Sequence, residues 1–158
     1  PLTIGADNDI IIDGNLSRSG SEAMLGLIAN NFIRVYHPTE IKKWSECTSY
    51  YYNGSCREYR NREECVNASG TIENITIEAA VFAIKHSFIV DNYRCGDSLG
   101  TLTVKGAIAQ NYRGAVGTSG GTGYLKNYNY DERLKTTVPP SFLTPKGSDW
   151  VIGRETVG

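Results

Sequence analysis

The stretch Ile75-Thr-Ile77-Glu-Ala79 alternates apolar and polar side chains and ends on a small residue. The same pattern recurs as Ile10-Ile-Ile12-Asp-Gly14 and as Leu102-Thr-Val104-Lys-Gly106. Alternation with a period of two, rich in β-branched residues, is typical of β-strands. A small residue after each strand suits a coil that turns a corner close to its neighbour. These stretches therefore predict the rungs of a β-solenoid.

Two further strands, Phe32–Val35 and Phe88–Val90, share the alternation without the small residue. From Ile75 through Phe88 to Leu102 the pattern advances by 13 and then 14 residues. Such short steps favour adjacent rungs, although a meander or sandwich has similar strand spacing. We therefore expect an all-β fold, an irregular right-handed parallel β-helix over about residues 2–116. Its predicted corners are Gly14, Ala79-Ala80 and Gly106-Ala107.

Length and charge limit what the chain can be. With 158 residues it predicts one domain, residues 1–158. Sixteen Lys+Arg against 17 Asp+Glu argue against binding to nucleic acid or anionic membranes. No run reaches the roughly 18 apolar residues of a membrane span, and the first residues are unlike a signal peptide. We therefore expect a mature or excised fragment. Its N-terminal segment is acidic, and the stretch over residues 105–135 is more basic.

A polar insert of different composition interrupts the predicted rungs at about residues 42–70. Its Asn53-Gly54 dipeptide favours a tight hairpin over residues 48–59. A rival interpretation starts a helix at Ser55, because Ser55-Cys-Arg-Glu58 matches a capping box. We favour the hairpin and allow a short helical turn around residues 60–65. With little apolar surface, the insert needs disulfides to stay ordered.

The four cysteines predict two disulfides and an extracellular or cell-surface location. They are Cys47, Cys56, Cys65 and Cys95, and three connectivities are open. Their spacing does not fit a zinc site. We predict no cofactor, although three aspartates, Asp7, Asp9 and Asp13, form an acidic cluster that could hold calcium. The spacing of these aspartates is not that of a calcium loop, and Asp in turns usually caps its own backbone.

Four Asn-x-Ser/Thr sequons make glycosylation a further prediction. They begin at Asn15, Asn53, Asn67 and Asn74, and Asn74 opens a strand.

Beyond residue 116 the composition changes to glycine and then proline. Residues 124–130 resume the alternation, and Pro139-Pro140-Ser-Phe142-Leu143-Thr-Pro145 is too rich in proline for a helix or a central strand. We expect residues 124–158 to form a covering segment, with Phe142 and Leu143 packed on the solenoid. We expect residues 150–152 to end the fold as a last strand or a short covering piece.

Catalytic constellations are weak. Gly117-Thr-Ser119-Gly-Gly121 matches a nucleophile motif, with His37 or His86 as base and Asp91 or Asp97 as orienting group, but no strand-turn-helix surrounds it. Two carboxylate pairs, Glu78 with Asp91 and Asp131 with Glu132, could serve a glycosidase. We predict that the chain is not an enzyme. Because polysaccharide lyases use parallel β-helices, a polysaccharide-active enzyme remains an alternative.

Tyrosine is the more informative residue type, since exposed aromatics beside mixed charge are typical of protein or glycan contact surfaces. The predicted contact residues are Tyr50, Tyr51, Tyr52, Tyr59, Tyr124, Tyr128 and Tyr130. The rival interpretation is that half of them are buried at the edges of the core.

Several runs resemble the extracellular part of pilin-associated surface proteins of actinobacteria and related lineages. The runs cover residues 25–38, 88–96, 102–114 and 123–134, and Pro139-Pro140-Ser-Phe142-Leu143 resembles a proline-rich segment that follows them. The resemblance implies a repeat-rich β domain preceded by a hydrophobic helix, which this sequence lacks. It carries over no catalytic residue.

Together these observations predict a non-catalytic extracellular module, structural or adhesive, on the cell surface or a pilus. Its expected partners are other surface or pilus subunits and a glycan or protein ligand. The first alternative is a subunit of a self-assembling filament, because the two ends of the chain differ in charge.

Overall fold

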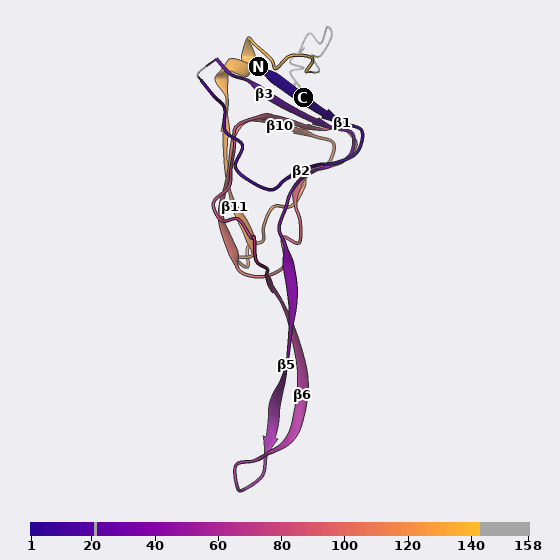
Figure 1. Ribbon diagram of the computed structural model, residues 1–158, viewed down its shortest axis with the longest axis vertical. Coiled ribbons are helices and arrows are strands. Elements are labelled where there is room, and N and C mark those ends of the chain that lie inside the picture. The colour runs from indigo at the N-terminus through magenta and orange to yellow at the C-terminus, as the bar shows by residue number, and fades with distance from the viewer. Residues whose placement is uncertain (21, 143–158) are drawn as a thin grey trace, which may run out of the picture.

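The computed structural model describes residues 1–20 and 22–142, and it confirms an all-β parallel solenoid of about 5 turns. Figure 1 looks along the coils, which have a three-sided outline. A long hairpin leaves this outline and projects away from it. The predicted fold class is therefore correct, and the polar insert is the hairpin.

The first face of the solenoid is a parallel sheet. It consists of β1 (Leu2–Ala6), β3 (Leu25–Ala29), β8 (Ala80–Ala83) and the second part of β10 (Ser98–Gln110), in that order. In its register Ile4 lies beside Leu27, Leu27 beside Val81 and Val81 beside Ile108. Equivalent apolar side chains thus stack from coil to coil, as the period of two requires.

The other two faces are built in the same way. The second face pairs β2 (Ile10–Ile12), β4 (Ile33–Val35) and β9 (Phe88–Val90) in parallel. The third pairs β7 (Thr76–Ile77), the first part of β10 and β11 (Gly123–Tyr130), and Leu16 adds an isolated bridge to Ile77. β10 is therefore a long strand that bends around the corner between the third and first faces.

The core fills the space between the three faces with stacked aliphatic side chains. Its largest fully buried apolar residues are Phe88, Leu27, Ile33, Ile75, Ile77, Leu99, Leu102, Val35, Val81, Val90 and Val104. Most of them occupy the apolar positions of the predicted strands. Burial of this stacked surface is the main favourable term in folding.

The small residues at the corners differ in whether packing requires them. A Cβ on Gly106 would lie 1.9 Å from Ala79 O, so the bend of β10 requires glycine. A Cβ on Gly14 would meet nothing within 4 Å. Packing therefore requires a small residue at the Gly106 corner, as predicted, but not at the Gly14 corner.

The hairpin is longer than predicted. Its strands are β5 (Thr39–Tyr50) and β6 (Cys56–Asn67), joined antiparallel from Thr39 beside Asn67 to Tyr50 beside Cys56. The helical turn expected at residues 60–65 is wrong, because these residues continue β6. Ser55 donates to the Asn53 side chain instead of capping a helix.

The C-terminal region also differs from its prediction. β11 does not cover the solenoid but extends it, pairing in parallel with β10 as the last rung of the third face. A short 3-10 helix, η1 (Glu132–Lys135), follows, and the chain returns to the first face. There the Phe142 ring packs against Phe82, with 6.3 Å between ring centroids, and Thr3 Oγ1 donates to Pro140 O. Leu143, Pro145 and residues 150–152 lie outside the described residues.

Candidate functional site

The hairpin joins the solenoid through a narrow base. Its two ends meet where the Ala68 N–H donates to Pro38 O over 3.0 Å. His37, the residue before Pro38, is buried. Its Nδ1 lies 3.2 Å from Asp91 O and its Nε2 lies 3.0 Å from Asn67 Oδ1. Since Asn67 ends β6 and Asp91 follows β9, the imidazole links the hairpin to the neighbouring coil. His37 is thus a structural residue at the hairpin base.

A disulfide reinforces the same base. Cys65 in β6 is bonded to Cys95 of the next coil, with 5.3 Å between their Cα atoms. Beside it the Gly96 N–H donates to Cys65 O over 3.1 Å. Gly96 has φ +68°, and a Cβ there would lie 1.9 Å from Asn67 Oδ1. Only glycine therefore lets the coil approach the hairpin this closely.

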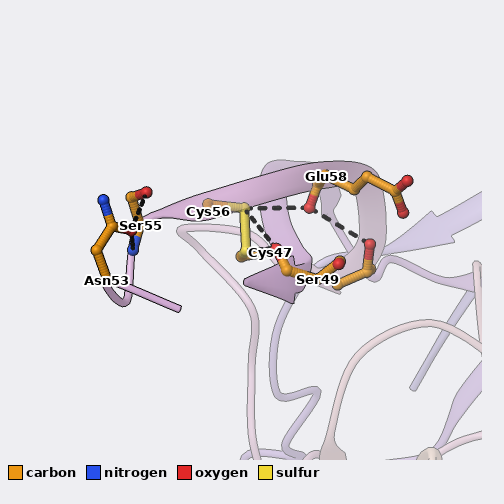
Figure 2. The surroundings of a disulfide bond; sticks show 7 residues. Cys47, Ser49, Asn53, Ser55, Cys56 and Glu58 are labelled. Atoms are coloured by element: carbon orange, nitrogen blue, oxygen red, sulfur yellow. Dashed lines mark hydrogen bonds between the residues drawn. A yellow bond between two sulfur atoms is a disulfide. The ribbon is translucent and has the colours of Figure 1, made fainter. Parts of the chain in front are cut away.

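The second disulfide closes the tip. Figure 2 shows Cys47 of β5 bonded to Cys56 of β6, with 5.8 Å between their Cα atoms. The adjoining turn is ordered by Asn53, whose Oδ1 accepts from the Ser55 N–H (3.1 Å) and hydroxyl (2.7 Å). Gly54 supplies the positive φ of +82°. The predicted Asn-Gly turn is confirmed, and the two disulfides leave none of the four cysteines free.

Between base and tip the hairpin is held by cross-strand pairs. Lys43 Nζ lies 3.7 Å from Glu63 Oε2, and Arg62 Nε donates to Glu46 Oε2 over 2.8 Å. Both pairs are solvent-exposed, so each contributes little. An isolated two-stranded hairpin is only marginally stable in water. The order of this one therefore depends on its disulfides at both ends.

The tip carries a concentration of exposed aromatic side chains. Tyr52 is fully exposed, and more than half of the surface of Tyr50, Tyr51 and Tyr59 is open to solvent. The Arg57 guanidinium lies 5.9 Å from the centroid of the Tyr51 ring. Trp44, halfway along β5 and opposite Arg62, is also exposed. We call residues 50–52, 57 and 59 the tip surface.

The other predicted contact tyrosines are not part of this surface. Tyr124 is buried, and its hydroxyl donates to Ile72 O over 2.5 Å. Burial raises its pKa. The prediction of Tyr124 as a contact residue is therefore wrong, because its place in β11 turns the ring into the core. Tyr128 and Tyr130 are exposed on β11, away from the hairpin tip (Figure 1).

The sequons differ in their surroundings. Asn53 is exposed in the tip turn, whereas Asn67 is half-buried beside His37. Asn15 Oδ1 accepts from the Thr76 N–H (2.7 Å), and Asn74 Oδ1 accepts from the Thr101 N–H (3.0 Å). Three of the four asparagines therefore have structural hydrogen bonds between distant segments, and Asn53 has only local ones.

The carboxylates of the predicted catalytic pairs are held by cationic partners. Glu78 accepts from the Arg18 backbone N–H (3.1 Å) and from Lys105 Nζ (3.0 Å), and these hydrogen bonds lower the pKa of its carboxyl. Asp91 accepts from Arg34 Nε over 2.8 Å. Each carboxylate is thus matched with its own cation, and a lowered pKa is the opposite of what a general acid needs.

The two carboxylates of the second pair, Asp131 and Glu132 at the end of β11, also have separate cationic partners. Asp131 accepts from Arg18 Nη1 (2.8 Å) and from Arg133 Nη2 (2.6 Å), whereas Glu132 forms an ion pair with Lys135.

The nucleophile motif is not assembled either. Ser119 lies in an exposed turn, and within residues 1–20 and 22–142 no hydrogen bond joins it to a histidine. The His86 ring stacks on Phe32, with 4.4 Å between centroids. Asp97 is exposed.

The aspartates proposed for calcium are not gathered into one site. Asp9 lies 3.4 Å from Arg34, and Asp7 and Asp13 are exposed. Over the described part of the chain, no cluster of three or more His, Cys, Asp or Glu side chains is placed to hold a metal ion.

The cysteines and the helices bear on the cellular compartment of the protein. Four cysteines paired in two disulfides indicate a non-cytoplasmic compartment. No helix among residues 1–20 and 22–142 is long and apolar enough to cross a membrane. No family model, curated protein or solved structure matches the chain, so the hairpin is identified as the candidate site by its geometry alone.

Proposed function

We propose that the chain is a non-catalytic extracellular binding module, in which the solenoid is a rigid base and the hairpin presents the tip surface to a protein or glycan ligand. The observation that carries the proposal is the exposed tyrosine cluster on an arm with a disulfide at each end. Ordering exposed aromatics in advance removes an entropic cost from binding.

The composition of the tip supports a contact role. Residues 49–55 read Ser-Tyr-Tyr-Tyr-Asn-Gly-Ser. Tyrosine supplies rigid amphipathic contact area at a low entropic cost, while Ser, Asn and Gly supply adaptable hydrogen bonds. The paired charges lower on the hairpin favour solubility over binding, because their partners already satisfy them.

The two disulfides support the proposed extracellular location, because such bonds persist in oxidising compartments. In this proposal the module belongs to a surface or pilus-associated protein, and its projecting hairpin serves in adhesion. The ion-paired carboxylates of Glu78, Asp91, Asp131 and Glu132 support a binding role over catalysis, because a substrate would have to compete with their cationic partners.

The test compares wild type with the triple variant Tyr50→Ser, Tyr51→Ser and Tyr52→Ser. The probes are a glycan array and intact cells measured by flow cytometry. We expect the triple variant to bind at least tenfold more weakly, because the aromatic contacts that act as binding hot spots are lost. Tyr112→Ser is the matched control, since Tyr112 is about as exposed as Tyr50 but lies on the solenoid.

Two outcomes would overturn the proposal. The triple variant could bind every probe as wild type does, which would remove the tip from the contact surface. Alternatively, a bound polysaccharide could be cleaved, measured as new reducing ends, which would make the chain an enzyme.

A further inference from the structure

The first coil of the solenoid has an open end. β1 pairs only with β3, and β2 only with β4, within the described residues. The Leu2 N–H donates to Met24 O and Ala6 O accepts from the Asn30 N–H, so the backbone groups of Thr3 and Gly5 point away from β3. These unpaired groups form a free parallel edge, which is a template for another strand.

Apolar side chains accompany this edge. Ile4 stacks on Leu27, which is 1% exposed, yet Ile4 itself is 45% exposed. Leu2 is 57% exposed. Ile4 therefore occupies a core position that lacks its covering coil at this end.

The last coil is open in the same sense. Among the described residues, the second part of β10 pairs only with β8, and β11 only with β10 within its sheet. Tyr128 stacks on buried Val104 but is 46% exposed. Together with Phe88, Arg113 and Lys126 it lines a hollow over the end of the core. This end thus also exposes positions that a further coil would cover.

The two ends carry opposite charge. Residues 1–17 contain three aspartates and no Lys or Arg. Residues 111–130 contain Arg113 and Lys126 and no Asp or Glu, and both of these cations are exposed. An acidic first coil and a basic last coil are complementary to each other, and each end repels its own kind.

We propose that the first coil of one copy stacks on the last coil of another, so that the solenoid continues from chain to chain as a head-to-tail filament. This inference is independent of the proposed binding function. The occupant of each open end is a second copy, because β1 at one end and β10 at the other present the same kind of parallel edge that already pairs coil with coil inside the chain.

The internal register predicts the contact. The first face runs from Thr3 through Gly26 and Ala80 to Ala107, so the next copy places its Thr3 beside Ala107. The third face runs from Leu16 through Ile77 and Val104 to Tyr128, so Leu16 follows Tyr128. Counted back from Leu16 and Tyr128, this register places Gly14 of one copy beside Lys126 of the other, and Asp13 is the residue next to Gly14.

Such a contact does not close on itself. Because two different ends meet, the association is heterologous and extends into a fibre. With coils about 4.8 Å apart and about 5 turns per chain, the rise per copy is roughly 19–24 Å. Each copy would then present one hairpin to the side of the fibre.

The charge test uses Asp13→Lys and Lys126→Glu, two exposed positions whose side chains form no hydrogen bond or ion pair within residues 1–20 and 22–142. Sedimentation and negative-stain imaging at low salt should show fibres for wild type and monomers for either variant. An equimolar mixture of the two variants should restore fibres in which the two variants alternate, because Lys at position 13 of one variant meets Glu at position 126 of the other, and the unchanged Asp13 meets the unchanged Lys126. Lys85→Glu, an exposed position in a middle coil, is the matched control and should assemble as wild type does.

The backbone test uses Gly5, where a Cβ meets nothing within 4 Å. Gly5→Pro removes an outward N–H without breaking a bond to β3 and should abolish fibres, whereas Gly5→Ala should retain them. Far-UV circular dichroism confirms that each variant is folded. Monomeric wild type at every concentration in low salt, or fibres that persist in both Gly5→Pro and Lys126→Glu, would overturn the proposal.

Discussion

Gly106 shows how one residue fixes the shape of a coil. It lies where β10 turns from the third face to the first, and the neighbouring coil contributes Ala79 O at the position a Cβ would take. Sequence alternation identified this glycine as a corner and grouped it with Gly14. Only the packing of adjacent coils separates the two, because Gly14 faces open space.

We expect Gly106→Ala to lower the free energy of unfolding by about 2–3 kcal/mol, because the corner must open to admit the methyl group. Gly14→Ala is the matched control, with a change within about 0.5 kcal/mol. Urea denaturation followed by far-UV circular dichroism measures both. Equal stability of the two variants would contradict the assignment of Gly106 as the tight corner.

Tyrosines also acquire their roles from tertiary structure. Tyr52 and Tyr124 both lie in tyrosine-rich stretches, and composition gave them the same predicted contact role. One lies in a projecting turn and is fully exposed, while the other lies in a rung and is buried. Burial is decided by which coil a residue joins, and that choice involves residues far away in the sequence.

At the scale of elements, the hairpin and the solenoid are held together by different forces. The solenoid has a stacked apolar core, whereas none of the buried apolar residues lies between residues 39 and 67. The hairpin instead has one disulfide at its tip, spanning 9 residues, and one at its base, spanning 30. The two bonds should therefore affect different parts of the molecule.

We expect removal of the base disulfide by Cys65→Ser with Cys95→Ser to lower the global free energy of unfolding by about 3–4 kcal/mol, from the entropy of the loop it closes. Removal of the tip disulfide by Cys47→Ser with Cys56→Ser should leave global unfolding nearly unchanged and loosen only the hairpin. Denaturation curves report the first effect, and amide hydrogen exchange of residues 44–62 reports the second. A larger global loss from the tip pair would contradict this division.

For the whole molecule, the hairpin is an insertion between two positions that already touch. Because the Ala68 N–H donates to Pro38 O, the chain can pass from one to the other without the intervening residues. The core of the solenoid is complete without them. The hairpin is thus an appendage of a fold that does not depend on it for burial.

We expect a chain in which Asn-Gly replaces residues 39–67, combined with Cys95→Ser, to fold cooperatively into the same solenoid. Its stability should fall by a few kcal/mol, because His37 loses Asn67 and the base disulfide is gone. Circular dichroism and a single urea transition test this. The full chain with Cys65→Ser and Cys95→Ser is the control, and a non-cooperative or unfolded deletion variant would contradict the prediction.

The sequence by itself determined the rungs, since alternation such as Ile75-Thr-Ile77 is a local property that fixes which side chains point inward. It also located the insert and indicated two disulfides from the number and context of the cysteines. Only the tertiary structure chose Cys47–Cys56 and Cys65–Cys95 among three connectivities, extended the hairpin to residues 39–67, and made β11 a rung. The physical reason is that pairing, length and burial depend on the register between coils, and that register joins residues from 23 to more than 50 positions apart.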